Sequence, residues 1–337
     1  MKGTLALCIG TILLLASSAR TAEPGTRLVS LLNYTDCIEL SNDATVVVLG
    51  HQAGGRVLKY EWSGEGALYL DPAESQWKQG TASNQVPMSA GRFDIGPEYL
   101  VPARANLWSG EWKAEITGPR AARLISQEDP ATGVQLIREF RLDEESSHLE
   151  CRQVIQNTSN ETQRWSHWGR TFAQHGGVVI VPLTPNVSRF PKGYILYQEH
   201  GLINFQPEDP HVKRMDDLLV IDGPPAYPKL GFDSNAGWMA YHMRNDRLFV
   251  KSYAVHPDRA YGELAAINLS IWYPAAERTP ACELEPIGPR NEIPPGASSS
   301  FTEHWWLLPY LFPSKPEQFN PQMISAVVRG MLERTPR

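Results

Sequence analysis

The sequence has no run of basic residues. Its 337 residues carry 31 Lys and Arg against 37 Asp and Glu, a formal net charge of −6 at pH 7. Binding along a nucleic-acid backbone or to an anionic membrane surface depends on clustered Lys and Arg. We therefore expect neither nucleic acid nor a membrane as a partner of the mature chain.

Several catalytic signatures are also missing. The sequence contains no GxSxG nucleophile elbow, no phosphate-binding P-loop, no HExxH zinc motif and no glycine pattern of a dinucleotide-binding fold. His200 and His211 are separated by loop residues without a metal-ligand spacing. These absences argue against the commonest hydrolase, nucleotide and zinc chemistries, and we expect no metal site.

Cysteine is scarce. Of the four cysteines, Cys8 lies in a segment that we expect to be removed, and Cys37, Cys151 and Cys282 stand far apart. At most one disulfide can form among these three, and all three can instead be buried thiols that pack as small apolar side chains. The sequence leaves both alternatives open.

The N-terminus has the features of a secretory signal. Lys2 provides the positive start, residues 5–16 form an apolar run too short to span a bilayer comfortably, and residues 16–19 offer small side chains for cleavage. We therefore expect residues 1–22 to be a signal peptide and the mature chain to be secreted or periplasmic.

Helical periodicity is nearly absent. Short segments of β-type composition follow one another up to residue 309, with Asn, Asp, Gly or Pro at the joins, and only residues 321–333 have the spacing of an amphipathic helix. This pattern predicts an all-β fold, a large, mostly antiparallel sandwich in one domain over residues 27–312. Residues 313–337 are then a C-terminal tail with one short helix.

One stretch, residues 89–112, is predicted as a loop because it is rich in Gly, Pro and single charges and poor in periodicity. Long loops inside a compact domain are often functional. The polar candidates in this loop are Arg92, Asp94, Glu98 and Arg104.

Residues 281–309 have the pattern strand, turn, strand. In the first strand Glu283 and Glu285 share one face, while Cys282 and Leu284 share the other. Two carboxylates on a strand face are costly to bury without partners. They indicate either a solvated face or a polar cleft, and we expect a cleft.

A second candidate segment covers residues 156–171. Alternation along its strand places Trp165 and His167 on one face, and Trp168 and Arg170 on the other. On pattern alone, a histidine between two tryptophans is more often packed than catalytic.

These segments together resemble the galactose mutarotase-like (aldose 1-epimerase-like) superfamily. The resemblance rests on an asparagine-headed turn before a strand with a histidine, a Leu-Glu strand near the C-terminus, a Pro-Gly turn, an early Gly-Gly turn and a Gly-Arg pair. The matching residues are Asn157 with His167, Leu284-Glu285, Pro295-Gly296, Gly54-Gly55 and Gly91-Arg92. The chain departs from the family pattern directly after His167 and after Glu285. It is more similar to an uncharacterised secreted branch, through Gly96-Pro97-Glu98, Lys229-Leu230-Gly231 and residues 303–307.

The resemblance implies an isomerase that interconverts sugar anomers in a cleft of the sandwich, without a metal or an organic cofactor. It implies Glu285, ionised at neutral pH, as the base and His167, with a free pKa of about 6.5, as the acid. Arg92 would hold sugar hydroxyls, and Trp168 or Trp165 would offer an apolar face to the sugar ring. The other expected substrate-binding residues are Glu98, Arg170, Lys229 and Glu283.

Two other functions stay open, both with a mono- or oligosaccharide as partner. A secreted carbohydrate-binding protein would keep the cleft and lack the acid–base pair. A glycan lyase or hydrolase would need a Tyr/His/Asn group or a separated pair of carboxylates. Tyr194, Tyr197 and Tyr241 are available for such a group.

Overall fold

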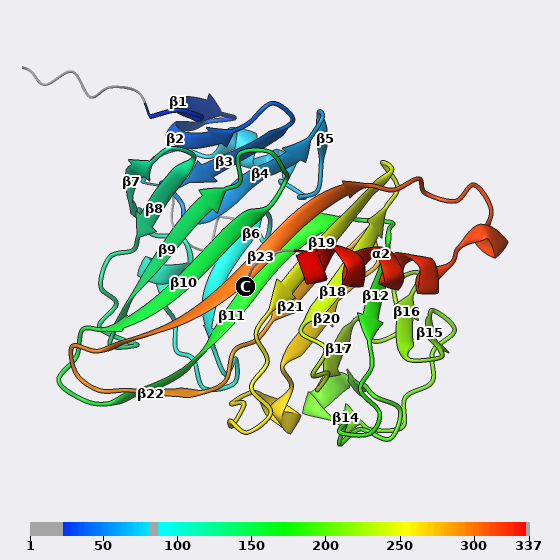
Figure 1. Ribbon diagram of the computed structural model, residues 1–337. Helices are drawn as coiled ribbons and strands as arrows, with labels where there is room; N and C mark the ends of the chain where they lie inside the picture. Colours follow the sequence, from blue (N-terminus) through cyan, green and yellow to red (C-terminus); the bar gives the residue numbers. More distant parts are fainter. Residues whose placement is uncertain (1–22, 81–86, 335–337) are drawn as a thin grey trace, which may run out of the picture.

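The protein folds into two antiparallel β-sheets that pack face to face (Figure 1). The computed structural model describes residues 23–80 and 87–334, so the expected signal peptide at residues 1–22 lies outside the described residues. The predicted all-β antiparallel sandwich with a short C-terminal helix is confirmed. None of the helices in the described ranges is long and apolar enough to cross a membrane.

The larger sheet has 13 strands and carries the polar residues of interest at its centre. Its middle strands β6, β11 and β21 come from distant parts of the sequence and lie side by side. In spatial order the strands are β1 (Thr26–Leu31), β2 (Tyr34–Ser41), β3 (Thr45–Gly50), β4 (Arg56–Trp62), β6 (Gly91–Gly96), β11 (Gln163–Gln174), β21 (Ala281–Pro286), β20 (Leu269–Trp272), β17 (Lys229–Phe232), β13 (Ile195–Tyr197) and β14 (Ile203–Asn204). Two short strands, β5 (Glu65–Gly66) and β22 (Asn291–Ile293), pair with β4 and β11.

The smaller sheet has 10 strands and carries the C-terminal helix on its outer face (Figure 1). Its order is β15 (Val212–Met215), β16 (Leu218–Ile221), β12 (Val178–Pro182), β18 (Trp238–Met243), β19 (Arg247–Tyr253), β23 (Ser298–Pro309), β10 (Leu149–Asn157), β9 (Val134–Leu142), β8 (Ala121–Ile125) and β7 (Lys113–Gly118). Helix α2 (Pro321–Arg334) buries Ile324 and Val328 in an apolar cluster with Trp306 of β23. The other helical turns in the part of the chain that the structure describes are α1 (Ala105–Trp108), η1 (Pro72–Gln76), η3 (Glu199–Gly201), η4 (Leu264–Ala266) and η5 (Pro316–Gln318).

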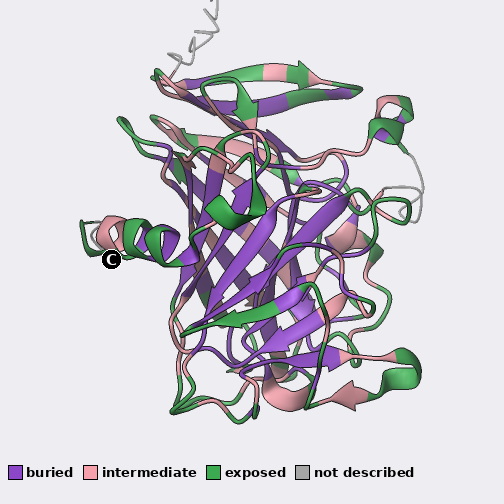
Figure 2. Cartoon of the chain, turned by 90° about the vertical axis from the view of Figure 1, so that its right-hand side faces the viewer, coloured by how far each residue is buried: buried purple, intermediate pink, exposed green. Residues whose placement is uncertain are grey.

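The core lies between the two sheets and follows from strand alternation. Phe93, Cys282 and Leu284 of the larger sheet belong to the same apolar cluster as Phe140 and Trp305 of the smaller one. Figure 2 shows buried strands running through the interior of the molecule. The residues that alternate with Phe93 and Leu284 therefore point to the outer face of the larger sheet.

An ion pair is buried in this interior. Lys251 Nζ of β19 lies 2.7 Å from Glu303 Oε2 of β23, and neither side chain is exposed. Gln153 donates to the other oxygen of Glu303 at 2.8 Å. Lys251 also donates to Thr171 Oγ1 at 2.9 Å and to the Leu284 carbonyl at 3.1 Å. This network links the smaller sheet to β11 and β21 on the side of the larger sheet that faces the core.

The prediction of a loop over residues 89–112 is wrong for its first part. Residues Gly91–Gly96 form strand β6, which is buried along its whole length and pairs with β11. Its four central residues alternate, with Phe93 and Ile95 in the core and Arg92 and Asp94 on the outer face. The flanking glycines and the single charges concealed this alternation.

The three described cysteines are free and buried, which settles the alternative that the sequence left open. Burial raises the pKa of Cys37 to about 11 and raises the pKa values of Cys151 and Cys282 as well. We expect these thiols to be unreactive toward a thiol reagent in the native protein and to react fully after denaturation in guanidinium. If fewer than these three thiols react after the protein is unfolded without reductant, the assignment of free thiols is contradicted.

Candidate functional site

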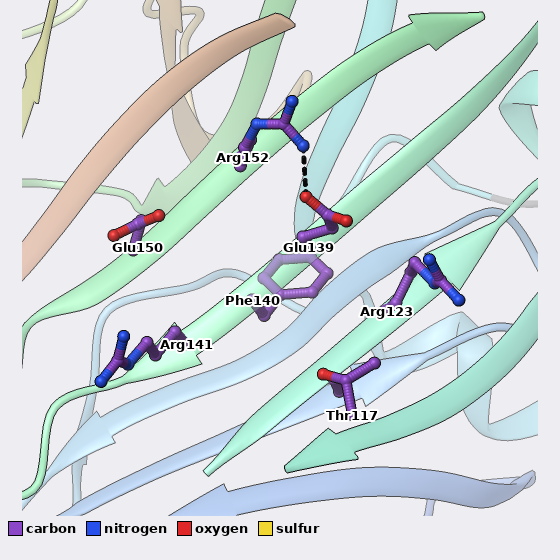
Figure 3. Close-up of a pocket in the computed structure, with 8 residues that line it drawn as sticks. Thr117, Arg123, Glu139, Phe140, Arg141, Glu150 and Arg152 are labelled. Atoms are coloured by element: carbon purple, nitrogen blue, oxygen red, sulfur yellow. Dashed lines mark hydrogen bonds and ion pairs between the residues drawn. The ribbon is translucent and has the colours of Figure 1, made fainter. Parts of the chain in front are cut away.

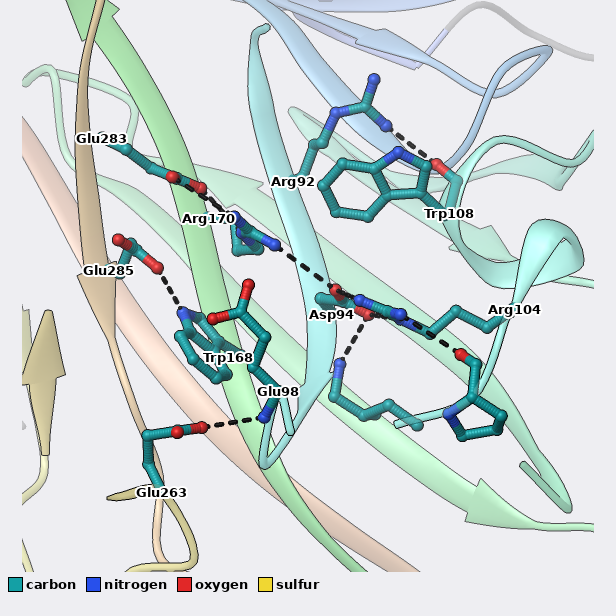
Figure 4. A network of polar contacts seen from close by, with 12 residues as sticks. Arg92, Asp94, Glu98, Arg104, Trp108, Trp168, Arg170, Glu263, Glu283 and Glu285 are labelled. Atoms are coloured by element: carbon teal, nitrogen blue, oxygen red, sulfur yellow. Dashed lines mark hydrogen bonds and ion pairs between the residues drawn. The ribbon is translucent and has the colours of Figure 1, made fainter. Parts of the chain in front are cut away.

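Charged and aromatic residues gather on the outer face of the larger sheet, where β6, β11 and β21 meet (Figure 4). We call this group the Arg170 cluster. It consists of Asp94, Glu98, Arg104, Trp168, Arg170, Lys229, Glu283 and Glu285. Trp168 and Arg170 stand two positions apart on β11, as do Glu283 and Glu285 on β21. Side chains two positions apart point to the same face of a sheet, and all four lie on the outer face. The shared face of each of these pairs is as predicted.

Arg170 lies at the centre of the cluster. Its Nε donates to Glu283 Oε1 at 2.7 Å, and its Nη1 is 3.9 Å from Asp94 Oδ2. Asp94 in turn accepts a hydrogen bond from Arg104 Nε at 2.6 Å. Burial opposes the charge of Arg170, but Glu283 and Glu285 outweigh it and raise the pKa of the guanidinium. Arg170 therefore stays a cation, held between two strands by carboxylates.

Glu285 is the carboxyl group with the most altered environment. Trp168 Nε1 donates to its Oε2 at 2.7 Å, and Ser270 Oγ donates to its Oε1 at 3.2 Å. The residue is only 1% exposed. Burial and the neighbouring Glu283 raise the pKa of Glu285 to about 8, although Arg170 and Lys229 act in the opposite direction. Glu285 is therefore largely protonated at neutral pH, contrary to the expected ionised base.

Lys229 and Glu98 form an ion pair above Trp168. The Lys229 ammonium lies 5.3 Å from the Trp168 ring centroid and 5.4 Å from that of Tyr197. Burial lowers the pKa of Lys229, but Glu285 and Glu98 outweigh this effect and raise it. Since Glu98 is exposed and Lys229 partly so, the cluster reaches the surface at this pair.

Two loops border this point and are tied to each other. The Glu98 main-chain N–H donates to Glu263 Oε2 at 2.8 Å, and the Tyr99 hydroxyl donates to the Gly262 carbonyl at 3.3 Å. The Tyr197 hydroxyl donates to the Leu264 carbonyl at 3.1 Å. The loop that follows β6 and the loop that precedes β20 thus form a joint rim beside the Lys229–Glu98 pair.

His167 lies on the opposite face of the sheet from Glu285, so the expectation that these two residues act as acid and base in one cleft is wrong. The His167 ring is 0% exposed and stacks between Phe93 and Phe301, at centroid distances of 5.7 and 5.9 Å. Its Nε2 lies 3.2 Å from the Ser299 carbonyl. Burial lowers the pKa of His167 to about 3, so the ring is neutral. Its position fits packing, the bland alternative for this histidine.

A His167→Phe variant tests this correction. A pKa of about 3 in the native state and 6.5 in the unfolded state gives His167 a stabilising contribution that is present above pH 6.5 and lost as the pH falls toward 3. We expect the variant to lose less stability than the wild type over that range in urea denaturation. Trp168→Phe changes the next residue, whose side chain lies on the other face, and should lose as much stability as the wild type between pH 6.5 and pH 3. If His167→Phe loses as much stability as the wild type over this pH range, the assignment of His167 as a buried, neutral residue is contradicted.

Arg92 is close to the cluster but does not offer free donors. It is buried, and its guanidinium donates to the carbonyls of Ser89, Pro87 and Trp108, the last at 2.8 Å. Its cation also lies 4.4 Å from the Trp108 ring. The expected contact of Arg92 with sugar hydroxyls has no support in this arrangement, because these carbonyls already accept from it.

Of the three tyrosines left open for a lyase, Tyr194 and Tyr241 are core residues and only Tyr197 borders the cluster. Three further residues border the cluster and were not predicted as site residues: Ser270, Trp108 and Glu263. No sequence signal could have identified Ser270, because it faces Glu285 on the neighbouring strand and that register cannot be read from the sequence.

A hollow of about 310 Å³ lies elsewhere, on the smaller sheet over β8, β9 and β10. Figure 3 shows the residues that line it. Arg152 pairs there with Glu139, and Arg123 pairs with Glu115. This is the pattern of a solvated strand face with cross-strand ion pairs. Within the described ranges, no group of three or more His, Cys, Asp or Glu could hold a metal ion.

Comparison with known proteins identifies the fold. No protein-family model matches the chain, and no curated protein matches its sequence. Among solved structures, a galactose mutarotase-like protein from Clostridium acetobutylicum aligns with a TM-score of 0.56 at 10% identity, covering 85% of this chain and 99% of that one. A galactose mutarotase-like protein from Lactobacillus casei aligns at 0.54 and 9% identity, covering 81% and 100%. The Slr1438 protein from Synechocystis aligns at 0.56 and 14% identity, covering 83% and 99%.

The chain therefore has the galactose mutarotase-like fold, as the sequence resemblance predicted. At these identities the likeness establishes the architecture only. What the chain does has to be argued from its own residues.

Proposed function

From the galactose mutarotase-like fold and the Arg170 cluster on its larger sheet, we propose that the protein binds a saccharide at this cluster and interconverts its anomers through Glu285. The carrying observation is the Glu285 carboxyl group, with a pKa raised to about 8, held by Trp168 and Ser270 beside Arg170. A perturbed carboxyl beside aromatic and hydrogen-bonding side chains is a typical candidate for acid–base work.

Glu285 can supply both proton transfers of the reaction. Ring opening removes the proton from the anomeric hydroxyl, breaks the bond between the anomeric carbon and the ring oxygen, and protonates that oxygen. A protonated carboxyl group accepts the first proton on its carbonyl oxygen and donates its own from the other oxygen, so it stays neutral throughout. Rotation of the free aldehyde and the reverse steps then give the other anomer. His167, on the other face, is not needed.

The other cluster residues would bind and orient the sugar. Arg170 and Arg104 are the cationic hydrogen-bond donors. Trp168 is 2% exposed and lies under Lys229, so it would offer an aromatic face to the sugar once Lys229 moves aside. Because Glu285 is 1% exposed and the Lys229–Glu98 pair lies above Trp168, the saccharide has to displace this pair to reach the carboxyl group. We also propose that the chain acts outside the cytoplasm, because of the signal-like residues 1–22.

A second candidate function is saccharide binding without catalysis. It is favoured by the burial of Glu285 and by the hydrogen bonds that both of its oxygens already accept, from Trp168 and Ser270. In that case Glu285 only accepts hydrogen bonds or fixes Trp168.

One pair of measurements separates the candidates. Exchange NMR or polarimetry on freshly dissolved glucose and galactose, at micromolar protein, should show faster anomer equilibration than buffer alone. Thermal-shift titration with the same sugars should raise the melting temperature, because a ligand that binds the native state stabilises it. A thermal shift without faster exchange would favour binding only, and the absence of both would overturn the proposal.

A further inference from the structure

We propose that the ligand of the Arg170 cluster is an uncharged saccharide of at least two rings, whose second ring lies on an apolar rim formed by Tyr99, Leu100 and Leu264. This inference rests on the proposed function and names its substrate class. It comes from two observations, the pairing of charges inside the cluster and the exposed apolar side chains beside it.

The charges of the cluster are already matched. Arg170 pairs with Glu283, Arg104 with Asp94, and Lys229 with Glu98. Arg92, behind them, donates to three main-chain carbonyls. A phosphate or carboxylate on the ligand would find no unpaired cation among these described residues, and it would meet the carboxylates that hold them. A neutral polyol brings no charge of its own. It can exchange hydrogen bonds with the same pairs, and Lys229 and Glu98 can move aside together as a pair, since each hydroxyl both donates and accepts.

Apolar side chains are exposed where the cluster reaches the surface. Tyr99 and Leu100 are 54% and 59% exposed, and Leu264 is 38% exposed. Tyr99 and Leu100 directly follow Glu98, and Leu264 directly follows Glu263, the residue that accepts from the Glu98 N–H. The rim is therefore continuous with the Lys229–Glu98 pair. Exposed apolar groups gathered beside a polar site indicate an interaction surface.

The rim is also held in place, which suits ring stacking. The Tyr99 hydroxyl bonds to the Gly262 carbonyl at 3.3 Å, and this contact and the Glu98–Glu263 bond join the two loops. A tyrosine fixed at its polar end presents its ring faces with few conformations to lose on binding. The C–H face of a pyranose is the apolar surface that complements it. A single ring over Trp168 would not cover this rim, whereas a second linked ring would.

Calorimetric titration of the purified protein with neutral disaccharides tests the inference. The probes are maltose, cellobiose and lactose, with glucose and galactose as single rings and glucuronate and glucose 6-phosphate as charged sugars. We expect at least one disaccharide to bind on the order of tenfold more tightly than its monosaccharides, the gain of burying one further ring face. The charged sugars should bind more weakly than glucose. Tyr99→Ala should remove the disaccharide preference. Tyr99→Phe keeps the ring and loses the hydroxyl bond to Gly262, so it should retain a reduced preference.

Leu311→Ala is the matched control, because Leu311 is an exposed apolar residue, 77% exposed, on the segment between β23 and α2 and away from the rim. It should retain the preference. Equal affinity for one and two rings, or tighter binding of a charged sugar, would overturn the inference while leaving saccharide binding at the cluster intact. If no sugar of the panel binds, both the inference and the proposed function fail.

Discussion

Replacing Glu285 with glutamine is expected to slow anomer interconversion by about 100- to 10,000-fold, the usual contribution of an acid–base group. Glutamine has nearly the same shape and can still accept the hydrogen bond from Trp168 Nε1. Its amide group cannot accept a proton on one atom and donate a proton from the other, as the carboxyl group does during ring opening. The measurement is exchange NMR at pH 7 with glucose and galactose. Glu39→Gln is the control, since Glu39 is a buried carboxylate paired with Arg27 near the N-terminal edge of the same sheet.

The pH dependence makes this prediction sharper. With a pKa of about 8, Glu285 is protonated at pH 7, so the wild-type rate should fall as the pH rises through about 8. A rate that instead rises through pH 8 would identify an ionised base, as the family resemblance implied. A Glu285→Gln rate equal to that of the wild type would leave saccharide binding as the only role of the site.

The same residue should also affect stability, with a defined sign. Its pKa is raised from 4.5 to about 8 on folding, so its favourable contribution is fully present below pH 4.5 and is lost as the pH rises through 8. Glutamine cannot ionise and carries no such loss. The stability of Glu285→Gln relative to the wild type should therefore increase between pH 4.5 and 8 in urea denaturation.

Strand alternation made half of the site predictable. Because successive side chains point to opposite faces, the sequence alone grouped Glu283 with Glu285 and Trp168 with Arg170. The structure brings these two pairs together on the outer face of the larger sheet. The same rule separates His167 from Trp168. The error lay in assigning His167 to the same cleft as Trp168 and Arg170, although alternation points its side chain to the other face.

What could not be predicted is the order of strands in the sheet. Strands β11 and β21 are neighbours although more than a hundred residues separate them, and Ser270 reaches Glu285 only because β20 pairs with β21 in one register. Residues 91–96 were hidden by their composition, since Gly91 and Gly96 leave only four side chains to show alternation. Such pairing depends on packing across the whole sandwich, and no local pattern encodes it.

Replacing Lys251 with methionine is expected to reduce the free energy of unfolding by about 3–5 kcal/mol, the usual cost of leaving one partner of a buried ion pair unpaired. Lys251 and Glu303 are both completely buried, 2.7 Å apart. Methionine fills a similar volume but leaves the Glu303 carboxylate with the amide of Gln153 and the indole of Trp305 as donors. The measurement is the midpoint of urea denaturation at pH 7. The exposed pair of Lys192 and Glu208 provides the control, and Lys192→Met should leave the midpoint unchanged.

A double variant, Lys251→Met with Glu303→Gln, should recover much of the lost stability, because it removes the unpaired charge along with its partner. Recovery of stability need not restore the site. Lys251 also donates to Thr171 Oγ1 and to the carbonyl of Leu284, which stands between Glu283 and Glu285 on β21. We therefore expect the double variant to fold and yet to bind sugars more weakly than the wild type. Wild-type sugar binding in the double variant would show that β11 and β21 hold the Arg170 cluster without support from the interior ion pair.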